Sequence, residues 1–370
     1  MATRATKPRT RSPTAPGLFD SPIAQGEIGL ATVAGHERAR SLLATQIREG
    51  RLPHAFLFVG PRGVGKRTTA LALVAQFFCD HGSGCAQCAS CVKLRRGVFL
   101  SLILIRPAEG KWAISIDQIK ELQHDLAFHP PDARGRFCLI LGADRMTADA
   151  QDAFLKTLEE PPPGNHLLLT TDRLEGVVPT IRSRCQRLSF LPLEDAQMEE
   201  FARRAGWQNE APISVAMGCP GLLQELLDPE LPLLRKALAR LLAAPRGCDD
   251  YARMAALLQL GDTKKREAAH SRERARLLLR LLRSLARDLL LLHRSGGRNS
   301  LAHDMIRNRD LLETLQECAQ DALWEYPGDW LRAFASSRRC IDLNIDPAAA
   351  LLQVVGHASR ETVRSGDLLQ

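Results

Sequence analysis

The sequence lacks the features of a membrane-spanning or secreted protein. Its 370 residues contain no apolar run of about 18 residues, the length that a membrane-spanning helix needs. The best candidate, LLLRLLRSLARDLLLLH from Leu277, is interrupted by three arginines and one aspartate. The first 19 residues are basic but lack an acidic residue and an apolar core, so they are no secretory signal. We expect a disordered basic tail over residues 1–25, with an organelle transit peptide as the alternative, no membrane association and a cytoplasmic protein.

The ten cysteines do not form the pattern of a disulfide framework. Four of them are crowded into CDHGSGCAQCASC, and the other six are scattered. Four thiolates at this spacing satisfy a tetrahedral Zn²⁺ fully and leave no open position for catalysis. We predict a structural zinc site, with an iron–sulfur cluster or free thiols as alternatives and His81 as a bystander. The predicted ligands are Cys79, Cys85, Cys88 and Cys91.

Length and composition are those of an ordinary globular protein with more than one domain. Apolar residues make up 45% and charged residues 25% of the chain, and the length favours two or three domains. The net charge of +8 is compatible with acidic partners such as nucleic acid or nucleotides but does not require them.

The first half of the chain alternates apolar strands with helices, which predicts an α/β fold with a mainly parallel sheet. A helix before the first strand is expected to place Leu42, Leu43 and Ile47 on one face. From residue 193 onward the pattern is helical almost throughout. The expected strands are AFLFVG (55–60), LSLILIR (100–106), FCLILG (137–142), HLLLTT (166–171) and CQRLSF (185–190).

A glycine-rich loop follows the first expected strand and precedes a helix, as in phosphate-binding loops of the form G-x-x-x-x-G-K. Its backbone N–H groups and the lysine would contact phosphates. Arg67 occupies the place of the usual hydroxyl residue, and Thr68 is rotated by about 100° along the helix, so we expect no Mg²⁺ there and leave nucleotide binding open. The candidate nucleotide-binding residues are Gly60, Gly63, Gly65, Lys66, Arg67 and Thr68.

ATP hydrolysis on such a loop also needs an acid at the end of a neighbouring strand. The strand FCLILG ends in Leu141 and Gly142, and the nearest acid is Asp144. We expect Asp144 to lie in the following turn as a helix-capping group. A shifted strand register that brings Asp144 into the site is the alternative.

The stretch VVPTIRSRCQRLSF places Arg182, Arg184 and Arg187 between two strands. Each is either a solvated surface charge or a finger that reaches a nucleotide on a neighbouring subunit. These residues alone favour neither reading.

Together, several stretches resemble the clamp-loader subunits of bacterial DNA polymerase III, which belong to the AAA+ superfamily. They are LPHAFLFVGPRGVGKRT, the cysteine cluster, DAFLKTLEEPP and PTIRSRC, in that order, and the resemblance covers roughly residues 30–230. It implies an AAA+ core over residues 26–192 with a zinc module at 79–91, a helical lid at 193–230, and a C-terminal helical collar at 231–370.

The resemblance also implies a role without hydrolysis. The motor subunits, gamma and tau, carry Thr, Asp-Glu and a lid arginine where this chain has Arg67, Leu141–Gly142 and Gly221. The SRC motif is intact, and in the family its arginine, here Arg184, acts in trans on the ATP of the next subunit. The implied partners are gamma/tau and delta subunits in a hetero-pentamer and, through it, the sliding clamp and primer-template DNA. The alternatives are an active motor that uses Asp144, and a zinc-dependent DNA-binding protein with a vestigial loop.

Overall fold

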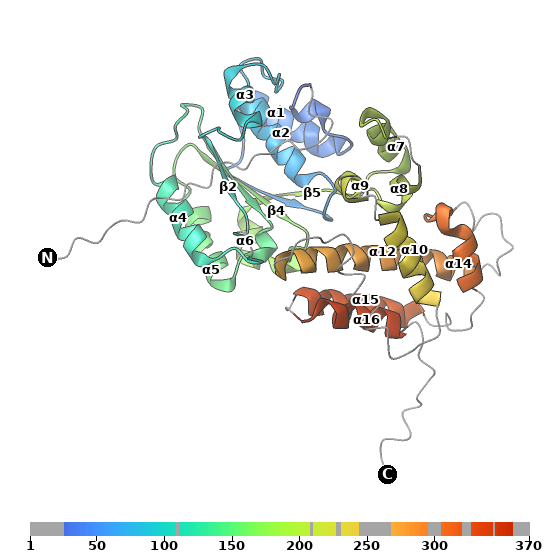
Figure 1. Ribbon diagram of the computed structural model, residues 1–370. Helices are drawn as coiled ribbons and strands as arrows, with labels where there is room; N and C mark the ends of the chain where they lie inside the picture. The colour runs from blue at the N-terminus through green and yellow to red at the C-terminus, as the bar shows by residue number, and fades with distance from the viewer. Residues whose placement is uncertain are drawn as a thin grey trace, which may run out of the picture. The chain divides into compact units, whose positions relative to one another are not determined.

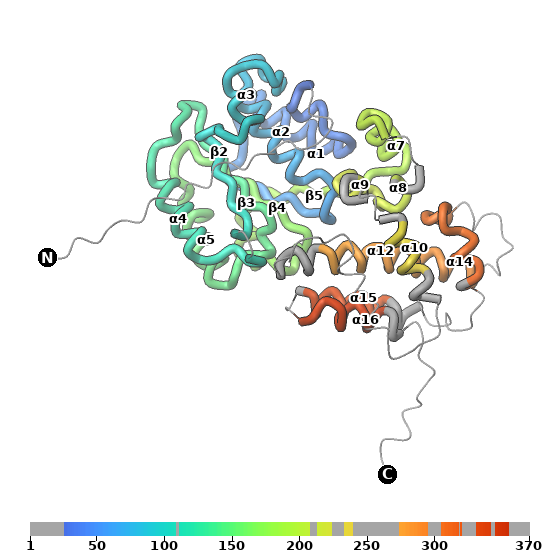
Figure 2. Tube along the Cα trace, viewed as in Figure 1, coloured from blue at the N-terminus to red at the C-terminus, as the bar shows by residue number. Residues whose placement is uncertain are grey.

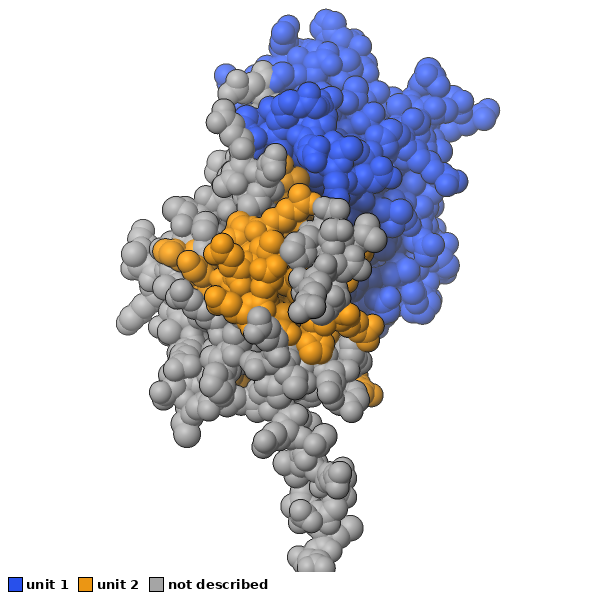
Figure 3. All heavy atoms as spheres, turned by 90° about the vertical axis from the view of Figure 1, so that its right-hand side faces the viewer, with its two compact units in different colours: residues 1–208, 218–222 blue, residues 209–217, 223–370 orange. Residues whose placement is uncertain are grey.

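The computed structural model describes residues 26–108, 111–207, 210–226, 231–243, 268–294, 305–319, 327–342 and 345–357. The basic tail predicted over residues 1–25 lies outside the described residues. The chain divides into two compact units, residues 1–208 with 218–222, and residues 209–217 with 223–370 (Figure 3). The division into core, lid and collar stays a prediction.

The first unit is built on a five-stranded sheet, as predicted. Its order is β2-β3-β4-β1-β5, and every neighbouring pair is parallel. The sheet confirms the α/β fold class, and every expected strand is present within two residues at either end. The strands are β1 (Ala55–Val59), β2 (Leu102–Ile105), β3 (Arg136–Leu141), β4 (Asn165–Thr171) and β5 (Gln186–Ser189).

Helices cover both faces of this sheet, with α4 and α5 on one face and α2 on the other (Figure 1). The helix predicted before the first strand is present as α1, and Leu43 is buried on it, but Leu42 is 37% exposed and does not share that face. The helices of this unit are α1 (Glu37–Arg48), α2 (Lys66–Phe78), α3 (Ala89–Arg95), α4 (Ile116–Leu126), α5 (Ala148–Glu159), α6 (Pro179–Arg184) and α7 (Asp195–Arg204).

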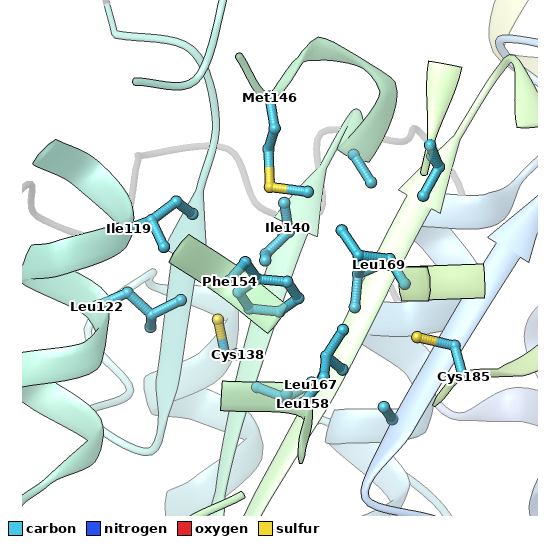
Figure 4. Close-up of a cluster of buried hydrophobic side chains, with 14 of the residues drawn as sticks. Ile119, Leu122, Cys138, Ile140, Met146, Phe154, Leu158, Leu167, Leu169 and Cys185 are labelled. Carbon is cyan, nitrogen blue, oxygen red and sulfur yellow. The ribbon is translucent and has the colours of Figure 1, made fainter. Parts of the chain in front are cut away.

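Alternating side chains of the central strands enter two separate apolar layers. Cys138 and Ile140 of β3 pack with Phe154 of α5 in the layer under α4 and α5 (Figure 4). Phe137, which precedes Cys138 in β3, meets the ring of Phe78 of α2 on the other side, with ring centroids 5.8 Å apart. A strand that is buried on both faces reads as a continuous apolar run, which is why the sequence shows these strands clearly.

The described residues of the second unit are almost entirely helical, as the sequence pattern predicts. It contains α8 (Glu210–Val215), most of α9 (Pro220–Leu226), α10 (Leu231–Ala243), α12 (Ala268–Arg294), α14 (Leu312–Cys318), α15 (Pro327–Asp342) and α16 (Pro347–His357). The leucine-rich α12 packs against α15 and α16 (Figure 2). Among the described residues, no helix has the length and apolar character needed to cross a membrane.

An acidic residue that interrupts the leucine run of α12 is fully buried. Asp288 Oδ2 accepts hydrogen bonds from the backbone N–H of Asn308 at 2.8 Å and from Asn308 Nδ2 at 2.7 Å. Asn308 Oδ1 in turn accepts from Arg235 Nη2 of α10 at 2.8 Å. A buried charge is tolerated only where its hydrogen-bonding capacity is used. Here the hydrogen bonds that satisfy Asp288 also hold the segment before α14 against α10 and α12.

Candidate functional site

The glycine-rich loop lies at the carboxyl end of the sheet, where the order of the strands reverses. β1, which leads into the loop, pairs with β4, and β4 pairs with β3. The ends of these three strands are therefore adjacent. In open α/β sheets this reversal is the place where ligands bind.

Three glycines of the loop are required by its conformation. Gly63 and Gly65 have φ angles of +80° and +112°, which side-chain-bearing residues rarely adopt. A Cβ at Gly60 would lie 2.3 Å from the backbone oxygen of Phe190. The glycine spacing found in the sequence thus corresponds to a real phosphate-loop geometry that leads directly into α2.

The ammonium group of Lys66, the first residue of α2, is hydrogen-bonded to other groups of the protein. Its Nζ donates to the backbone oxygens of Gly60 and Pro61 at 2.7 and 2.8 Å, and to Asp172 Oδ1 at 2.8 Å. The lysine side chain is 7% exposed and that of Asp172, which follows β4, is 30% exposed. Asp172 was not among the residues expected at the site, because nothing in the local sequence around it suggests a partner 106 residues away.

The two residues after Lys66 differ from it in burial. Arg67 and Thr68 are exposed on the first turn of α2. The next residue, Thr69, is buried, and its hydroxyl donates to the backbone oxygen of Gly65 at 2.9 Å. Neither Arg67 nor Thr68 is therefore packed into the loop.

The end of β3 has no carboxylate, and Asp144 is not a helix cap. Asp144 lies in a 3-10 turn (Ala143–Arg145), as expected, but its Oδ1 accepts from Thr171 Oγ1 at 2.9 Å and its Oδ2 pairs with Arg173 Nε at 3.4 Å. The cap of α5 is Thr147, whose hydroxyl oxygen accepts from the backbone N–H of Ala150. The expectation of a capping aspartate was wrong because Thr147 directly precedes the helix, which is the position that caps it.

Gly142 adopts a conformation that suits glycine. Its φ angle is +82°, and its N–H donates to Thr170 Oγ1 at 3.1 Å. A Cβ there would lie 3.1 Å from Cδ of Arg145. A residue with a side chain, such as glutamate, would be strained in this backbone conformation.

The start of α9 packs on the loop within the first unit. The N–H of Gly221 donates to the backbone oxygen of Gly63 at 2.7 Å, and a Cβ at Gly221 would lie 2.9 Å from Cα of Gly63. The sequence indicated the missing lid arginine at Gly221 but not this close approach.

His36 also contacts the loop, and sequence reasoning missed it. Its Nε2 hydrogen-bonds to the backbone oxygen of Val64 at 2.8 Å, and its ring lies 4.8 Å from that of Phe190. Burial lowers the pKa of His36, so the neutral ring, with Nε2 as the donor, is favoured at neutral pH. Nothing in the sequence indicated its left-handed backbone, with a φ angle of +54°.

Arg184 is the last residue of the short helix α6. Its Nη2 pairs with Glu159 Oε1 at 2.8 Å, and its Nη1 donates to the backbone oxygen of Thr180 at 3.1 Å. The side chains of Arg184 and Glu159 are 37% and 49% exposed. Arg182 is half-buried and Arg187 is exposed. The next residue, Cys185, is buried, which raises the pKa of its thiol to about 12.

The four clustered cysteines are brought together in a compact knuckle. The Sγ atoms of Cys79, Cys85, Cys88 and Cys91 all lie within 4.8 Å of one another. Sulfur atoms of a tetrahedral zinc site are separated by about 3.8 Å, from Zn–S bonds of about 2.3 Å. The arrangement therefore fits a four-thiolate metal site such as zinc. His81 is not one of this group, although its Nδ1 lies 3.6 Å from Cys85 Sγ.

Backbone donors around the knuckle favour thiolates. Burial opposes ionisation of Cys79, but N–H groups of Cys85 and His81, each 3.4 Å from its sulfur, help lower its pKa to about 5. Burial raises the pKa of Cys91. A bound cation would offset that effect, as it does for thiolate ligands generally.

The knuckle is fixed to the core from two sides. On one side, the N–H of Ile28 donates to the oxygen of Gly84 at 2.7 Å. On the other, Arg134 Nη1 donates to the oxygen of Phe78 at 2.9 Å, and Arg134 Nη2 pairs with Asp132 at 3.0 Å. The cysteine site is therefore built into the α/β unit.

Comparisons with known proteins agree with this geometry. Residues 35–194 match the family described as DNA polymerase III, delta subunit. The chain is 36% identical over 165 residues to DNA polymerase III subunit delta' of Bacillus subtilis, covering 44% of this chain and 50% of that protein. It is 33% identical over 154 residues to subunit delta' of Pseudomonas aeruginosa (40% and 47%) and 31% identical over 207 residues to subunit tau/gamma of Haemophilus influenzae (54% and 30%).

These relatives match between 40% and 54% of the chain, and the chain spans half or less of their length. A solved structure of a gamma subunit-related protein from Thermotoga maritima aligns over 86% of this chain and 99% of that one, at 18% identity and a TM-score of 0.38, too low to add to the assignment. The assignment rests on the sequence matches and the parallel sheet with its phosphate loop. Residues 35–194 thus resemble the DNA polymerase III subunits named delta' and tau/gamma, and the first unit folds as a parallel α/β sheet with a phosphate loop.

Proposed function

We propose that this chain is a delta prime subunit of a clamp loader, which hydrolyses no ATP itself and supplies Arg184 to the ATP site of a neighbouring subunit. Its partners would be gamma/tau and delta subunits in a hetero-pentamer. Through that complex it would act on the sliding clamp and primer-template DNA during replication. The similarity to delta' relatives supports the partners and the process.

The observation that carries the proposal is the end of β3. Where a motor subunit of this family has two acids, this chain has Leu141 and Gly142, and Gly142 has a left-handed backbone. The next carboxylate in the sequence, Asp144, has both oxygens engaged by Thr171 and Arg173. A hydrolytic site needs a carboxylate to hold Mg²⁺ and to orient water, and no residue at this strand end provides one.

Arg184 supports the second half of the proposal. Its guanidinium is more than a third exposed at the end of α6, and its one carboxylate contact is with a half-exposed glutamate. Such a group can exchange Glu159 for a phosphate at little cost, because exposed ion pairs contribute only about 0–1 kcal/mol.

The cysteine knuckle would have a structural role. Zinc bound by Cys79, Cys85, Cys88 and Cys91 would contribute folding free energy and no catalytic position, since four thiolates complete its coordination.

The proposal is tested by reconstitution. We expect the full chain to co-purify with gamma/tau and delta subunits and to show no ATPase activity alone. Arg184→Ala should lower the DNA-stimulated ATPase of the assembled complex at least tenfold, whereas Arg182→Ala, two residues away on the same helix, should not. Equal activity of the Arg184→Ala and wild-type complexes would contradict the finger role.

An active motor is the second candidate, because the tau/gamma subunit of Haemophilus influenzae matches over 207 residues, more than the 165 residues of delta' of Bacillus subtilis. It predicts Mg²⁺-dependent turnover by the isolated chain that is lost on Lys66→Ala. Absence of such turnover at high protein concentration would remove this candidate.

A further inference from the structure

Two side chains of α5 hold the two ends of α6, the short helix that ends in Arg184 (Figure 1). Gln151, near the start of α5, binds the backbone at the N-terminal end of α6. Glu159, the last residue of α5, pairs with Arg184 at the C-terminal end. The two side chains are separated by roughly two turns of α5, so both can face the same short helix.

The contacts of Gln151 are buried and use its whole amide group. Its Oε1 accepts from the backbone N–H of Val178, the residue before α6, at 2.9 Å. Its Nε2 donates to the backbone oxygen of Gly176 at 3.1 Å and to that of Met146 at 3.3 Å. The side chain is 6% exposed. A carboxamide has two N–H donors and an acceptor oxygen, and all of these are directed at backbone groups here.

The contact at the other end of α6 is the weaker one. Arg184 and Glu159 are both more than a third exposed, and ion pairs of this kind contribute little to stability. Under the proposed function, Arg184 leaves Glu159 when it meets a phosphate on the neighbouring subunit. The helix must then be held by its buried contacts, which include the hydrogen bonds of Gln151 and the apolar packing of Ile181. Of these two, the hydrogen bonds are the directional contacts.

The turn before α6 is held against the same part of the chain by a second residue. A Cβ on Gly176 would lie 2.8 Å from Cβ of Asp144, so this turn rests directly on Asp144. Asp144 in turn accepts from Thr171 and pairs with Arg173. The backbone between β4 and α6 is therefore fixed to the segment between β3 and α5, and Gln151 extends this attachment to the start of α6.

We propose that Gln151 is a positioning residue, which fixes α6 and thereby aims the guanidinium of Arg184 at the nucleotide of a neighbouring subunit. Gln151 touches no nucleotide in this role and acts through Arg184. An arginine finger stabilises the transferring phosphoryl group only from the correct place, and a small misplacement of such a group lowers the rate strongly. The inference rests on the proposed function, since it names the residue that orients the finger proposed there.

The first measurement uses the isolated full-length chain and does not depend on the finger role. Gln151→Met keeps the approximate size of the side chain but removes its acceptor and both donors. Hydrogen exchange resolved to single amides should become at least about fivefold faster at Ile181 and Arg182. The N–H groups of these two residues donate to the backbone oxygen of Val178, not to Gln151, so faster exchange there reports opening of the helix rather than loss of one acceptor.

Gln123→Met is the matched control for this variant. The Nε2 of Gln123 donates to the backbone oxygen of Ala153 at 2.7 Å and to the hydroxyl of Thr157 at 3.1 Å, so it binds α5 in the same way that Gln151 binds α6. Its replacement removes an amide of the same kind from the same layer of helices. Exchange at Ile181 should stay at the wild-type rate in this control.

The second measurement is the DNA-stimulated ATPase of the complex assembled with gamma/tau and delta subunits. Gln151→Met should lower kcat at least about threefold and leave the ATP concentration for half-maximal rate unchanged, because a finger acts on the transition state. The double variant Gln151→Met/Arg184→Ala should be no slower than Arg184→Ala alone, since a positioning residue has no effect once the group that it positions is gone. Gln123→Met should keep the wild-type kcat.

Three results would each overturn the inference: unchanged exchange at Ile181 and Arg182 in Gln151→Met, a wild-type kcat of its complex, or a further loss of kcat in the double variant. Gln151→Leu provides a second variant in case the methionine protein does not fold, as judged by thermal unfolding. The proposed function fails separately. A wild-type rate of the Arg184→Ala complex would refute the finger role, while the exchange rates would still show whether Gln151 holds α6.

Discussion

Arg184 Nη2 lies 2.8 Å from Glu159 Oε1, so the last residue of α6 is paired with the last residue of α5. The two residues are 25 positions apart in the sequence, and they belong to the motifs LKTLEEPP and SRC, which meet through this ion pair. Neither partner is buried. The contact can orient the guanidinium, but it contributes little to the stability of the fold.

Arg184→Ala should therefore leave the isolated chain folded. Loss of a half-exposed ion pair is expected to change the free energy of unfolding by less than about 1 kcal/mol. Urea unfolding followed by circular dichroism measures this, and Glu159→Gln should give a similar small change. If Arg184→Ala lowered the free energy of unfolding by several kcal/mol, the side chain would be needed for folding. Any effect on a partner's ATPase would then be indirect.

Gly142→Ala should destabilise the protein by about 1–2 kcal/mol, the cost of a left-handed backbone at a residue with a side chain. Gly50→Ala is the matched comparison, because Gly50 also has a positive φ, +65°, but nothing lies within 4 Å of an added Cβ. The Gly142 variant should lose at least as much as the Gly50 variant in urea unfolding, since its Cβ also meets the side chain of Arg145. A neutral effect at Gly142 would show that the end of β3 accepts a side chain, so that its left-handed backbone does not require glycine.

Most of the sheet and the cysteine site could be predicted because their signals are local. Each strand is an apolar run bounded by polar residues or glycine, and the four cysteines lie within 13 residues. The loop glycines and Lys66 also form one contiguous motif. In each case the residues that act together are close in sequence.

The contacts that define the state of the site are not local, and the sequence did not reveal them. Lys66 and Asp172 are 106 residues apart, and their pairing depends on β4 lying beside β1. Asp288 illustrates the same limit in the helical unit, since it interrupts a leucine run and yet is buried by a segment 20 residues further on. Side-chain partners of this kind follow from strand order and helix packing, which a one-dimensional pattern does not contain.

The purified chain should contain about one equivalent of zinc under reducing conditions, and Cys88→Ser should lower that content well below one. Metal analysis by atomic emission measures both. Cys340→Ser is the control, because Cys340 lies on α15, outside the knuckle, and its replacement should leave the metal content unchanged. Wild-type protein with substantially less than one equivalent would contradict the metal site.

Arg134→Ala should speed zinc loss to a chelator several-fold without abolishing zinc binding. Arg134 donates to the backbone oxygen of Phe78, the residue before the first cysteine, and its guanidinium lies 5.4 Å from the centre of the Phe78 ring. Removal of this anchor should let the end of α2 open more often, which exposes Cys79 to the chelator. Arg95→Ala, at an exposed position on α3, should release zinc at the wild-type rate. Equal rates for both variants would show that Arg134 does not anchor the knuckle.

The stability of the α/β unit should fall as the pH decreases below about 6.5, the ordinary pKa of histidine. Burial lowers the pKa of His36 and that of His166, whose Nδ1 lies 3.1 Å from the oxygen of Pro53. Because both rings take up a proton more readily in the unfolded chain, the unfolded state binds more protons in this window and is favoured as the pH falls. Urea unfolding between pH 7.5 and pH 5, in roughly half-unit steps, measures the slope. His166→Phe should reduce it, whereas replacement of the exposed His129 by asparagine should not. A slope that is identical in wild type and His166→Phe would mean that the ring stays accessible to protons in the folded protein, despite its packing against Phe137 at a centroid distance of 4.9 Å.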